Sequence, residues 1–276
     1  MKRGHWQILL AAALFLLALG LTLYPVVSNW YIGRHQSRIQ TEYREVLEQT
    51  DSAEIESIRE SAVAYNKTIT PGAAEEAYSQ ASIRLAAEDY VNQLNVSGSG
   101  IMGYVEIPKI GVDLPIYHGT GADSLDRGTG HLLGSSLPVG GESTHTIITG
   151  HSGMASQKMF TDLEQLREGD IFYLHVLDET LTYEVREIHT VLPHDTTYLG
   201  IEPGEDLCTL VTCTPTGVNT HRLLVHGSRI PYVPTEETEA SAVPHEENTD
   251  SNWEKQYWLG VRLGLAAMVF LTLMAG

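Results

Sequence analysis

The sequence predicts a mainly β protein whose central domain is a closed β-barrel, preceded by a helical region and flanked by an apolar helix at each terminus. From about residue 100 to residue 230 the chain holds many short β-type runs and few helical patterns, which favours a barrel. From residue 29 to about residue 95 apolar residues recur at spacings of three and four, which is typical of amphipathic helices.

The helical region is expected to span residues 29–99. Its two periodic segments are IQTEYREVLEQ and EAYSQASIRLAAEDYVNQL, and Pro71 and Gly72 break the helical pattern between them. A second break, NVSGSG at residues 95–100, indicates the boundary with the barrel domain, which we expect to span residues 100–233.

The barrel domain is expected to contain several strands and one short helix. GYVEIPKIGVDLPIYHG predicts two short strands joined near a turn, and STHTIITGH predicts a strand that ends at Gly150 and His151. SQKMFTDLEQL predicts the short helix. The next segment, DIFYLHVLDETLTYEVREIHTVLP, predicts a strand, a tight turn at Asp178 and Glu179, and a long strand. DLCTLVTC and HRLLVHGSRI predict the last two strands.

Both ends of the chain are apolar. Residues 8–27 hold twenty positions without a charge, about the length that crosses a bilayer, so residues 1–28 predict an anchor. Lys2 and Arg3 precede this segment, which favours a cytoplasmic amino terminus. The alternative is a signal peptide that is cleaved after Ser28.

A second apolar segment, residues 257–276, predicts a carboxyl-terminal membrane helix, and Arg262 near its start could reach the interface. Residues 234–256 are acidic and poor in large apolar residues, which predicts a disordered linker. If both segments cross the membrane, the residues between them lie outside the cell.

The charge balance limits the class of partner. Lys and Arg number 17 and Asp and Glu number 35, so the formal net charge is −18. Nucleic acid is disfavoured because its phosphates need cationic contacts. The charge is compatible with an exported protein that binds basic or neutral polypeptide.

The chain has two cysteines, Cys208 and Cys213. Five positions along a strand separate their Cα atoms by roughly 16 Å, whereas a disulfide needs Cα atoms within about 7 Å. We therefore expect two free thiols. Cys208 has a simple explanation as a small buried apolar residue.

Three residues form a candidate catalytic group. Cys213 and His151 each end a predicted strand, and Arg222 begins the strand after Cys213. Acyl transfer needs a nucleophile, a proton carrier and an oxyanion donor, and these three residue types can supply them. The spacing alone also allows a packed cysteine, a solvated histidine and a surface arginine.

Five other histidines raise the question of a metal site, namely His118, His131, His145, His221 and His226. None of them forms a ligand pair with a cysteine or an acidic residue at zinc-like spacing. We therefore expect no metal site.

The motifs TLVTC, TGHSG and NTHRLLVHG resemble the signature motifs of the sortase family. From about Gly100 to Ile230 the chain is similar to class C, pilus-assembling sortases, in order and throughout. The resemblance implies an eight-stranded sortase β-barrel and membrane segments in a Gram-positive envelope, with the catalytic domain outside the cell. It implies that Cys213 is the nucleophile, His151 the general acid and base, and Arg222 the oxyanion or substrate stabiliser. Thr212 matches the family's substrate-contacting threonine.

The implied activity is that of a cysteine transpeptidase, which needs no metal and no organic cofactor. It would cleave an LPXTG-like sorting signal between Thr and Gly through a thioester, and then join the signal to a lysine amine of a pilin subunit. Pilin subunits and the lipid bilayer are the implied partners. The alternatives are a sortase that anchors proteins to a cell-wall precursor, a hydrolytic cysteine protease, and a non-enzymatic membrane-held β module.

The sequence departs from the class C pattern in one respect. Many class C sortases carry an Asp-Pro-aromatic lid motif in the amino-terminal region. Here the only prolines before residue 100 are Pro25 and Pro71, and neither follows an Asp. We expect an open site; the alternative is a cover formed by other residues around YNKTITPGAAEEAY.

Overall fold

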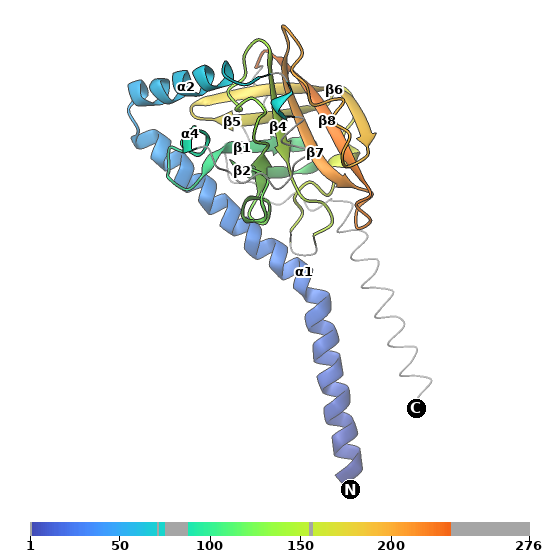
Figure 1. Ribbon diagram of the computed structural model, residues 1–276. Helices are drawn as coiled ribbons and strands as arrows, with labels where there is room; N and C mark the ends of the chain where they lie inside the picture. The colour runs from blue at the N-terminus through green and yellow to red at the C-terminus, as the bar shows by residue number, and fades with distance from the viewer. Residues whose placement is uncertain (1, 71, 75–87, 155–156, 233–276) are drawn as a thin grey trace. The chain divides into compact units, whose positions relative to one another are not determined.

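The computed structural model describes residues 2–70, 72–74, 88–154 and 157–232 (Figure 1). The helices are α1 (Lys2–Gln49), α2 (Ser52–Asn66), α4 (Glu88–Val91) and α5 (Ala122–Leu125), with 3-10 turns η1 (Pro108–Ile110) and η2 (Leu163–Gln165). The strands are β1 (Ile101–Ile107), β2 (Val112–His118), β3 (Thr129–His131), β4 (Thr144–Thr149), β5 (Ile171–Val176), β6 (Glu179–Val191), β7 (Asp206–Thr214) and β8 (His221–Ile230).

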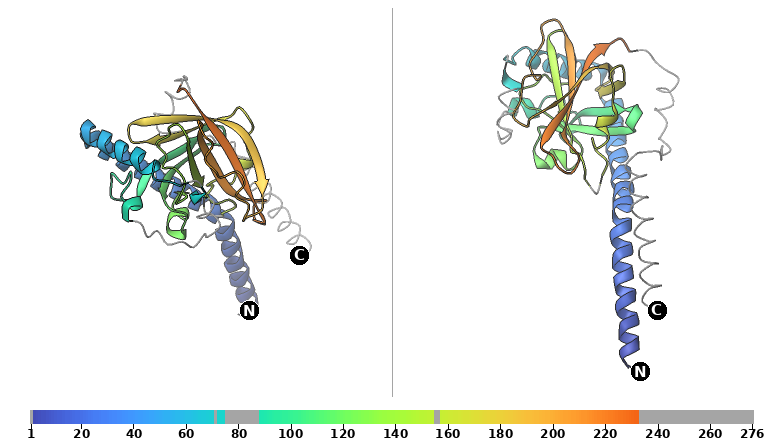
Figure 2. Two further views of the ribbon diagram at one scale, coloured as in Figure 1. Left: turned by 45° about the horizontal axis from the view of Figure 1, so that its top comes forward. Right: turned by 90° about the vertical axis from the view of Figure 1, so that its right-hand side faces the viewer.

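The eight strands form a closed barrel in the order β1-β2-β3-β4-β7-β8-β6-β5 (Figure 2). The pairs β2–β3 and β4–β7 are parallel, and the other six pairs are antiparallel. The predicted eight-stranded β-barrel is therefore confirmed. Closure leaves the barrel without an open sheet edge.

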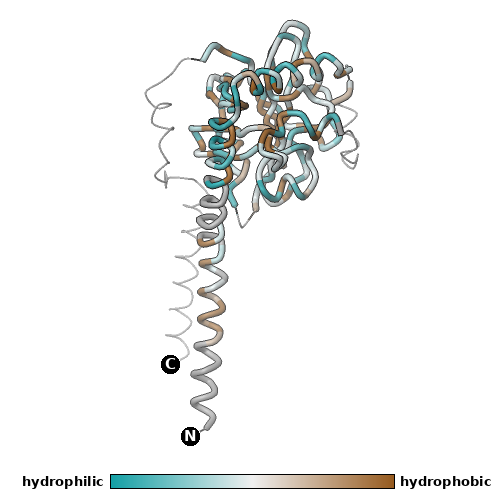
Figure 3. The backbone as a smooth tube through the Cα atoms, turned by 90° about the vertical axis from the view of Figure 1, so that its left-hand side faces the viewer, coloured by the Kyte–Doolittle hydropathy of each residue, from teal (hydrophilic) through white to brown (hydrophobic). Residues whose placement is uncertain are grey.

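Every second side chain along the strands points into the barrel and fills its interior. Successive strand side chains point to opposite faces, so on β7 Cys208 and Leu210 enter the interior and pack with Val225 of β8. The same main cluster holds Phe172 of β5 and Ile116 of β2, both fully buried. Figure 3 shows that hydrophobic and hydrophilic positions both occur along the barrel part of the chain. Burial of apolar area at about 25 cal/mol per Å² drives this packing.

A second buried cluster lies on the outer face of β4, β7, β8 and β6. Ile147, Val211 and Leu224 belong to it, and Leu199 from the β6–β7 connection packs onto them. Ala74, which follows α2, also belongs to it. The connection between β6 and β7 therefore packs on the same face of β7 that carries Cys213.

The helical region packs on the barrel rather than standing apart from it. Asp51 caps α2 by accepting a hydrogen bond from the Ala53 amide at 2.7 Å. The side-chain amide of Asn66, at the end of α2, exchanges two hydrogen bonds with the backbone of Leu137. Ile55 of α2 and Tyr90 of α4 are buried in the main core cluster.

Two local predictions were wrong. In residues 157–166, the described part of the predicted helix 156–166, only η2 is helical, because Met159 has a left-handed backbone with φ 45° and Phe160 and Leu163 both turn into the core. The tight turn between β5 and β6 lies one residue earlier than predicted, at Leu177 and Asp178, where Leu177 has φ 53°. The three-residue strand β3 was not predicted from the pattern, since it is too short to show alternation.

The predicted membrane segments have different outcomes. Residues 8–27 fall within α1. The predicted linker, residues 234–256, and the predicted carboxyl-terminal membrane helix, residues 257–276, lie outside the described residues. Within the described part of the chain, no helix combines the length and the apolar character needed to span a bilayer.

Candidate active site

β7 places Cys213 between two neighbouring strands. On one side, the antiparallel register of β7 and β8 sets Cys213 directly opposite Arg222. Directly opposite residues have their Cβ atoms about 4.5–5.5 Å apart and point to the same face. The thiol and the guanidinium therefore leave adjacent strands side by side.

On the other side of β7, the parallel strand β4 delivers His151. The β4–β7 register pairs Thr149 with Val211, and the Gly150 amide continues it by donating to the Val211 carbonyl at 3.0 Å. His151 thus leaves β4 at the level of Cys213. The Ser152 hydroxyl donates to the Cys213 carbonyl at 2.6 Å, which holds the two segments together.

Thr212 holds the turn that carries His151. Its side chain is buried and points to the opposite face from Cys213, as neighbouring strand residues must. The Thr212 hydroxyl donates to the Gly150 carbonyl at 2.8 Å. Substrate contact by Thr212 stays a prediction, whereas its hydrogen bond to the turn is a feature of the structure.

The glycine before His151 is required by packing. A Cβ atom at Gly150 would lie 2.7 Å from the ring of Phe160, closer than side chains approach. The Phe160 amide also donates to the His151 carbonyl at 2.9 Å. The segment that follows β4 is therefore pressed against Phe160, and this contact fixes where His151 leaves the strand.

The side chain of Arg222 folds back toward the β7–β8 connection. Its Nη1 atom donates to the carbonyls of His221 at 3.0 Å and Asn219 at 3.3 Å. A guanidinium carries five N–H donors, so donors remain for a substrate oxygen. Arg222 is half-buried.

His151 also faces an acidic residue. Its Nε2 atom lies 3.8 Å from an Asp126 carboxylate oxygen, and both side chains are well exposed. Exposed pairs of this kind contribute little free energy, about 0–1 kcal/mol. No sequence pattern predicted this neighbour, because Asp126 follows α5 and lies in the β2–β3 connection.

The two cysteines have different environments, and both are free as expected. Cys208 is fully buried in the barrel, and burial raises the pKa of its thiol well above the usual value. Cys213 is partly exposed on the outer face. Because the thiolate is the nucleophile, only Cys213 is placed for chemistry.

The arrangement brings together the parts that acyl transfer needs. Cys213 lies on the strand between β4, which His151 follows, and β8, which carries Arg222. The N–H groups of the guanidinium can stabilise an oxyanion. The sequence-predicted residues Cys213, His151 and Arg222 are thus gathered at one end of β4, β7 and β8.

The other histidines are distributed around the barrel. In the described part of the chain, no group of three or more His, Cys, Asp and Glu residues could hold a metal ion. Sequence reasoning missed one association: Thr209 lies between His145 and His226 and hydrogen-bonds to both.

Comparison with known proteins identifies the fold family. Residues 105–230 match the model of the sortase domain. The chain is 45% identical in sequence to the crystal structure of Streptococcus pneumoniae sortase C, covering 72% of this chain and all of that chain with a TM-score of 0.64. This chain belongs to the sortase family.

Other relatives agree with this assignment. Sortase C1 of Streptococcus agalactiae is 42% identical, with 71% of this chain and all of that chain covered and a TM-score of 0.63. Sortase A of Streptococcus agalactiae is 26% identical over 79% of this chain and 82% of that protein. Sortases are cysteine transpeptidases, which confirms the predicted enzyme class, and the resemblance to class C sortases is confirmed as well.

Proposed function

We propose that this sortase polymerises pilin subunits, with Cys213 as nucleophile, His151 as general acid and base, and Arg222 as oxyanion donor. The observation that supports these roles best is the register that sets Cys213 opposite Arg222, while His151 comes two residues after the end of β4. One similar structure is titled a pilus-related sortase C of Group B Streptococcus, and it is 38% identical to this chain.

In the first half-reaction the Cys213 thiolate attacks the carbonyl carbon of Thr in an LPXTG-like sorting signal. The carbonyl oxygen becomes an oxyanion, which accepts hydrogen bonds from the Arg222 guanidinium. The C–N bond to Gly then breaks, and the His151 imidazolium donates its proton to the departing amine. A thioester remains on Cys213.

In the second half-reaction a lysine amine of another pilin subunit attacks the thioester carbon. His151, now neutral, removes a proton from the attacking amine, and the C–S bond breaks to regenerate the thiolate. The product is an isopeptide bond between two polypeptides. We propose Thr212 as a substrate-contacting residue whose hydroxyl bond to Gly150 also keeps His151 at the level of the thiol.

The site is proposed to act at a membrane. Residues 8–27 carry no charge, and the apolar side chains of Leu14, Phe15, Leu16 and Leu17 are more than half exposed. Such a surface suits contact with lipid. We infer a Gram-positive membrane location with the barrel outside the cell; proteinase accessibility of the barrel in intact cells tests the orientation.

The test of function is co-expression of the full chain with candidate pilins, followed by electrophoresis in SDS. Ladders that resist SDS, and that are lost in Cys213→Ala, are expected from isopeptide bonds. Mass spectrometry then identifies the amine that was joined. Linkage to a cell-wall peptide in place of a pilin lysine would assign the alternative role of surface-protein anchoring, and release of free Thr carboxylate alone would assign a protease.

A further inference from the structure

The chain that carries His151 leaves the β4–β7 ladder beside the thiol. Beyond the end of β4, the Gly150 amide still donates to the Val211 carbonyl at 3.0 Å. In a regular parallel ladder the Cys213 amide would next donate to the Gly150 carbonyl, and the Ser152 amide to the Cys213 carbonyl. In the described part of the chain, neither of these two backbone hydrogen bonds forms.

Two side-chain hydroxyl groups take the place of these backbone donors. The Thr212 hydroxyl donates to the Gly150 carbonyl at 2.8 Å, and the Ser152 hydroxyl donates to the Cys213 carbonyl at 2.6 Å. The same two carbonyl groups are therefore satisfied, but by groups that stand out from their own backbone. Because the two hydroxyl bonds involve the residues before and after His151, they tie its main chain to the strand that carries the thiol.

The segment after β4 is also tied to the chain before η2. The His151 carbonyl accepts from the Phe160 amide at 2.9 Å, and the Gly153 amide donates to the Thr161 hydroxyl at 3.0 Å. These two bonds do not involve β7. The Ser152 hydroxyl bond is the one that joins the segment to the residue of the proposed nucleophile.

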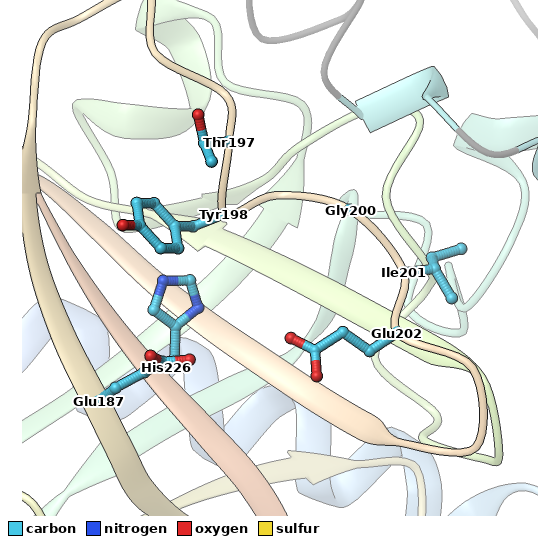
Figure 4. Close-up of a pocket in the computed structure, with 7 residues that line it drawn as sticks. All are labelled: Glu187, Thr197, Tyr198, Gly200, Ile201, Glu202 and His226. Atoms are coloured by element: carbon cyan, nitrogen blue, oxygen red, sulfur yellow. The ribbon is translucent and has the colours of Figure 1, made fainter.

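A cavity of about 150 Å³ on the outer face lies apart from this segment. It is lined by the β6–β7 connection together with Glu187 of β6 and His226 of β8 (Figure 4). Thr209 of β7, which hydrogen-bonds to His226, is four residues from Cys213, or about 13 Å. At this distance the residues of the cavity do not contact the main chain beside His151.

The placement of His151 matters most where the leaving group needs a proton. In the proposed acylation, the imidazolium donates its proton to the amine as the C–N bond breaks. A misplacement of about 1 Å can lower the rate of such a step by on the order of 100-fold. Without the Ser152 hydroxyl the main chain beside His151 would be released, whereas Cys213 would stay paired with Arg222 in the β7–β8 ladder.

We propose that Ser152 is a positioning residue for the acylation step, whose hydroxyl holds His151 within reach of the departing amine. This inference rests on the proposed function, because it assigns proton donation to His151. It predicts a specific kinetic signature: loss of the Ser152 hydroxyl should slow the reactions whose leaving group must be protonated and spare those whose leaving group needs no proton.

The test compares two acyl donors in single-turnover acylation of the full chain, held in detergent micelles. The first is a labelled peptide that contains Leu-Pro-Ala-Thr-Gly, and the second has sulfur in place of the Gly nitrogen. With the amide, the C–N bond breaks and the amine takes a proton from His151. With the thioester, the C–S bond breaks and a thiolate leaves without a proton. Both reactions leave the same acyl group on Cys213.

Ser152→Ala should lower the rate with the amide by about tenfold or more and leave the rate with the thioester nearly unchanged. Ser61→Ala is the matched control, because it removes an exposed hydroxyl of α2 that donates to Gln93 at 3.1 Å, and it should change neither rate. Equal losses with both donors would mean that Ser152 supports the thiol or the strand end rather than proton transfer. Unchanged rates with both donors would mean that its hydroxyl is dispensable. Either result would overturn the proposal.

His151→Ala separates a failure of this inference from a failure of the proposed function. It should lower the rate with the amide by about 100-fold or more, the scale of general acid catalysis, and the rate with the thioester far less. If His151→Ala shows this selectivity and Ser152→Ala does not, only the positioning role of Ser152 is wrong. If His151→Ala shows no selectivity, the proton-donating role of His151 is wrong, and the role of Ser152 falls with it.

Discussion

Cys213 and Arg222 face each other across the β7–β8 pair, so the thiol and the guanidinium share the outer face of the barrel. Many reactive cysteines are activated at the amino terminus of a helix, but β7 offers no helix dipole at this position. Arg222, on the neighbouring strand, is the cation that we propose acts beside this thiol. A single substitution at Arg222 can therefore test its proposed role.

Arg222→Lys should lower the rate of thioester formation by about 100-fold, the scale expected for losing one oxyanion donor. Lysine keeps the charge but lacks the planar fork of donors. The measurement is single-turnover acylation with a labelled sorting peptide. Arg38→Lys is the matched control, because Arg38 is exposed and its ion pair among the described residues is with Glu42 within α1. An acylation rate near that of the unchanged protein would contradict the role of Arg222.

Cys213→Ala should abolish both acyl-enzyme formation and alkylation by a thiol reagent, with little change in the free energy of unfolding. Cys208→Ala should leave acyl-enzyme formation and alkylation intact and should lower the free energy of unfolding. Cys208 is fully buried, and its raised pKa keeps the thiol protonated. Its loss should cost about 1 kcal/mol of stability. Mass spectrometry of the alkylated native protein checks both variants. Modification at Cys208 before Cys213 would refute the assignment of the nucleophile.

Thr212→Val should lower activity and also destabilise the protein by about 1–3 kcal/mol, the range for leaving a buried polar group unpaired. The unpaired group would be the Gly150 carbonyl, which accepts from the Thr212 hydroxyl. Thr212→Ser retains the hydroxyl and should retain most of both properties. Steady-state kinetics separate two roles: a lower kcat at constant KM indicates positioning of His151, and a higher KM indicates contact with substrate. Unchanged kinetics in Thr212→Val would exclude both roles of Thr212.

Much of the active site was predictable because it depends on strand periodicity. Cys208 and Cys213 are five residues apart, so alternation alone places them on opposite faces of β7. The strand ends at His151 and at Arg222 were also visible as boundaries of apolar runs. What the pattern could not supply was the strand order, since β4 and β7 are parallel neighbours separated by two other strands in the chain.

Contacts from connections between strands were not predictable. Asp126 reaches His151 from the β2–β3 connection, and Glu202 reaches the cavity beside His226 from the β6–β7 connection. Irregular segments have no periodicity that fixes where a side chain points. The helix predicted at 156–166 failed for a related reason, because the burial of Phe160 and Leu163 overrides the helical pattern of the sequence.

His131 should make the protein sensitive to acid. It is fully buried, its Nε2 atom donates to the Ser136 carbonyl at 2.9 Å, and its Nδ1 atom accepts from the Tyr90 hydroxyl at 2.9 Å. Burial lowers the pKa of this imidazole to about 4. The network therefore requires a neutral ring, in which one nitrogen donates and the other accepts.

The sign of the effect follows from the two pKa values. In the unfolded chain His131 takes up a proton as the pH falls through about 6.5, whereas the folded protein does so only near pH 4. The stability that the neutral ring contributes is complete above pH 6.5 and is lost as the pH falls toward 4. At 1.36 kcal/mol per unit, this loss is on the order of 3 kcal/mol.

His131→Gln tests this contribution, since glutamine can still donate to Ser136 but does not titrate. The variant should be less stable at pH 7 and should lose less stability than the unchanged protein between pH 7 and pH 4.5. Urea unfolding at several pH values, followed by far-UV circular dichroism, gives the two slopes. His194→Gln removes an exposed histidine and should leave the slope unchanged. Parallel slopes for His131→Gln and the unchanged protein would show that acid acts through other groups, such as His226, whose pKa burial lowers in the same direction.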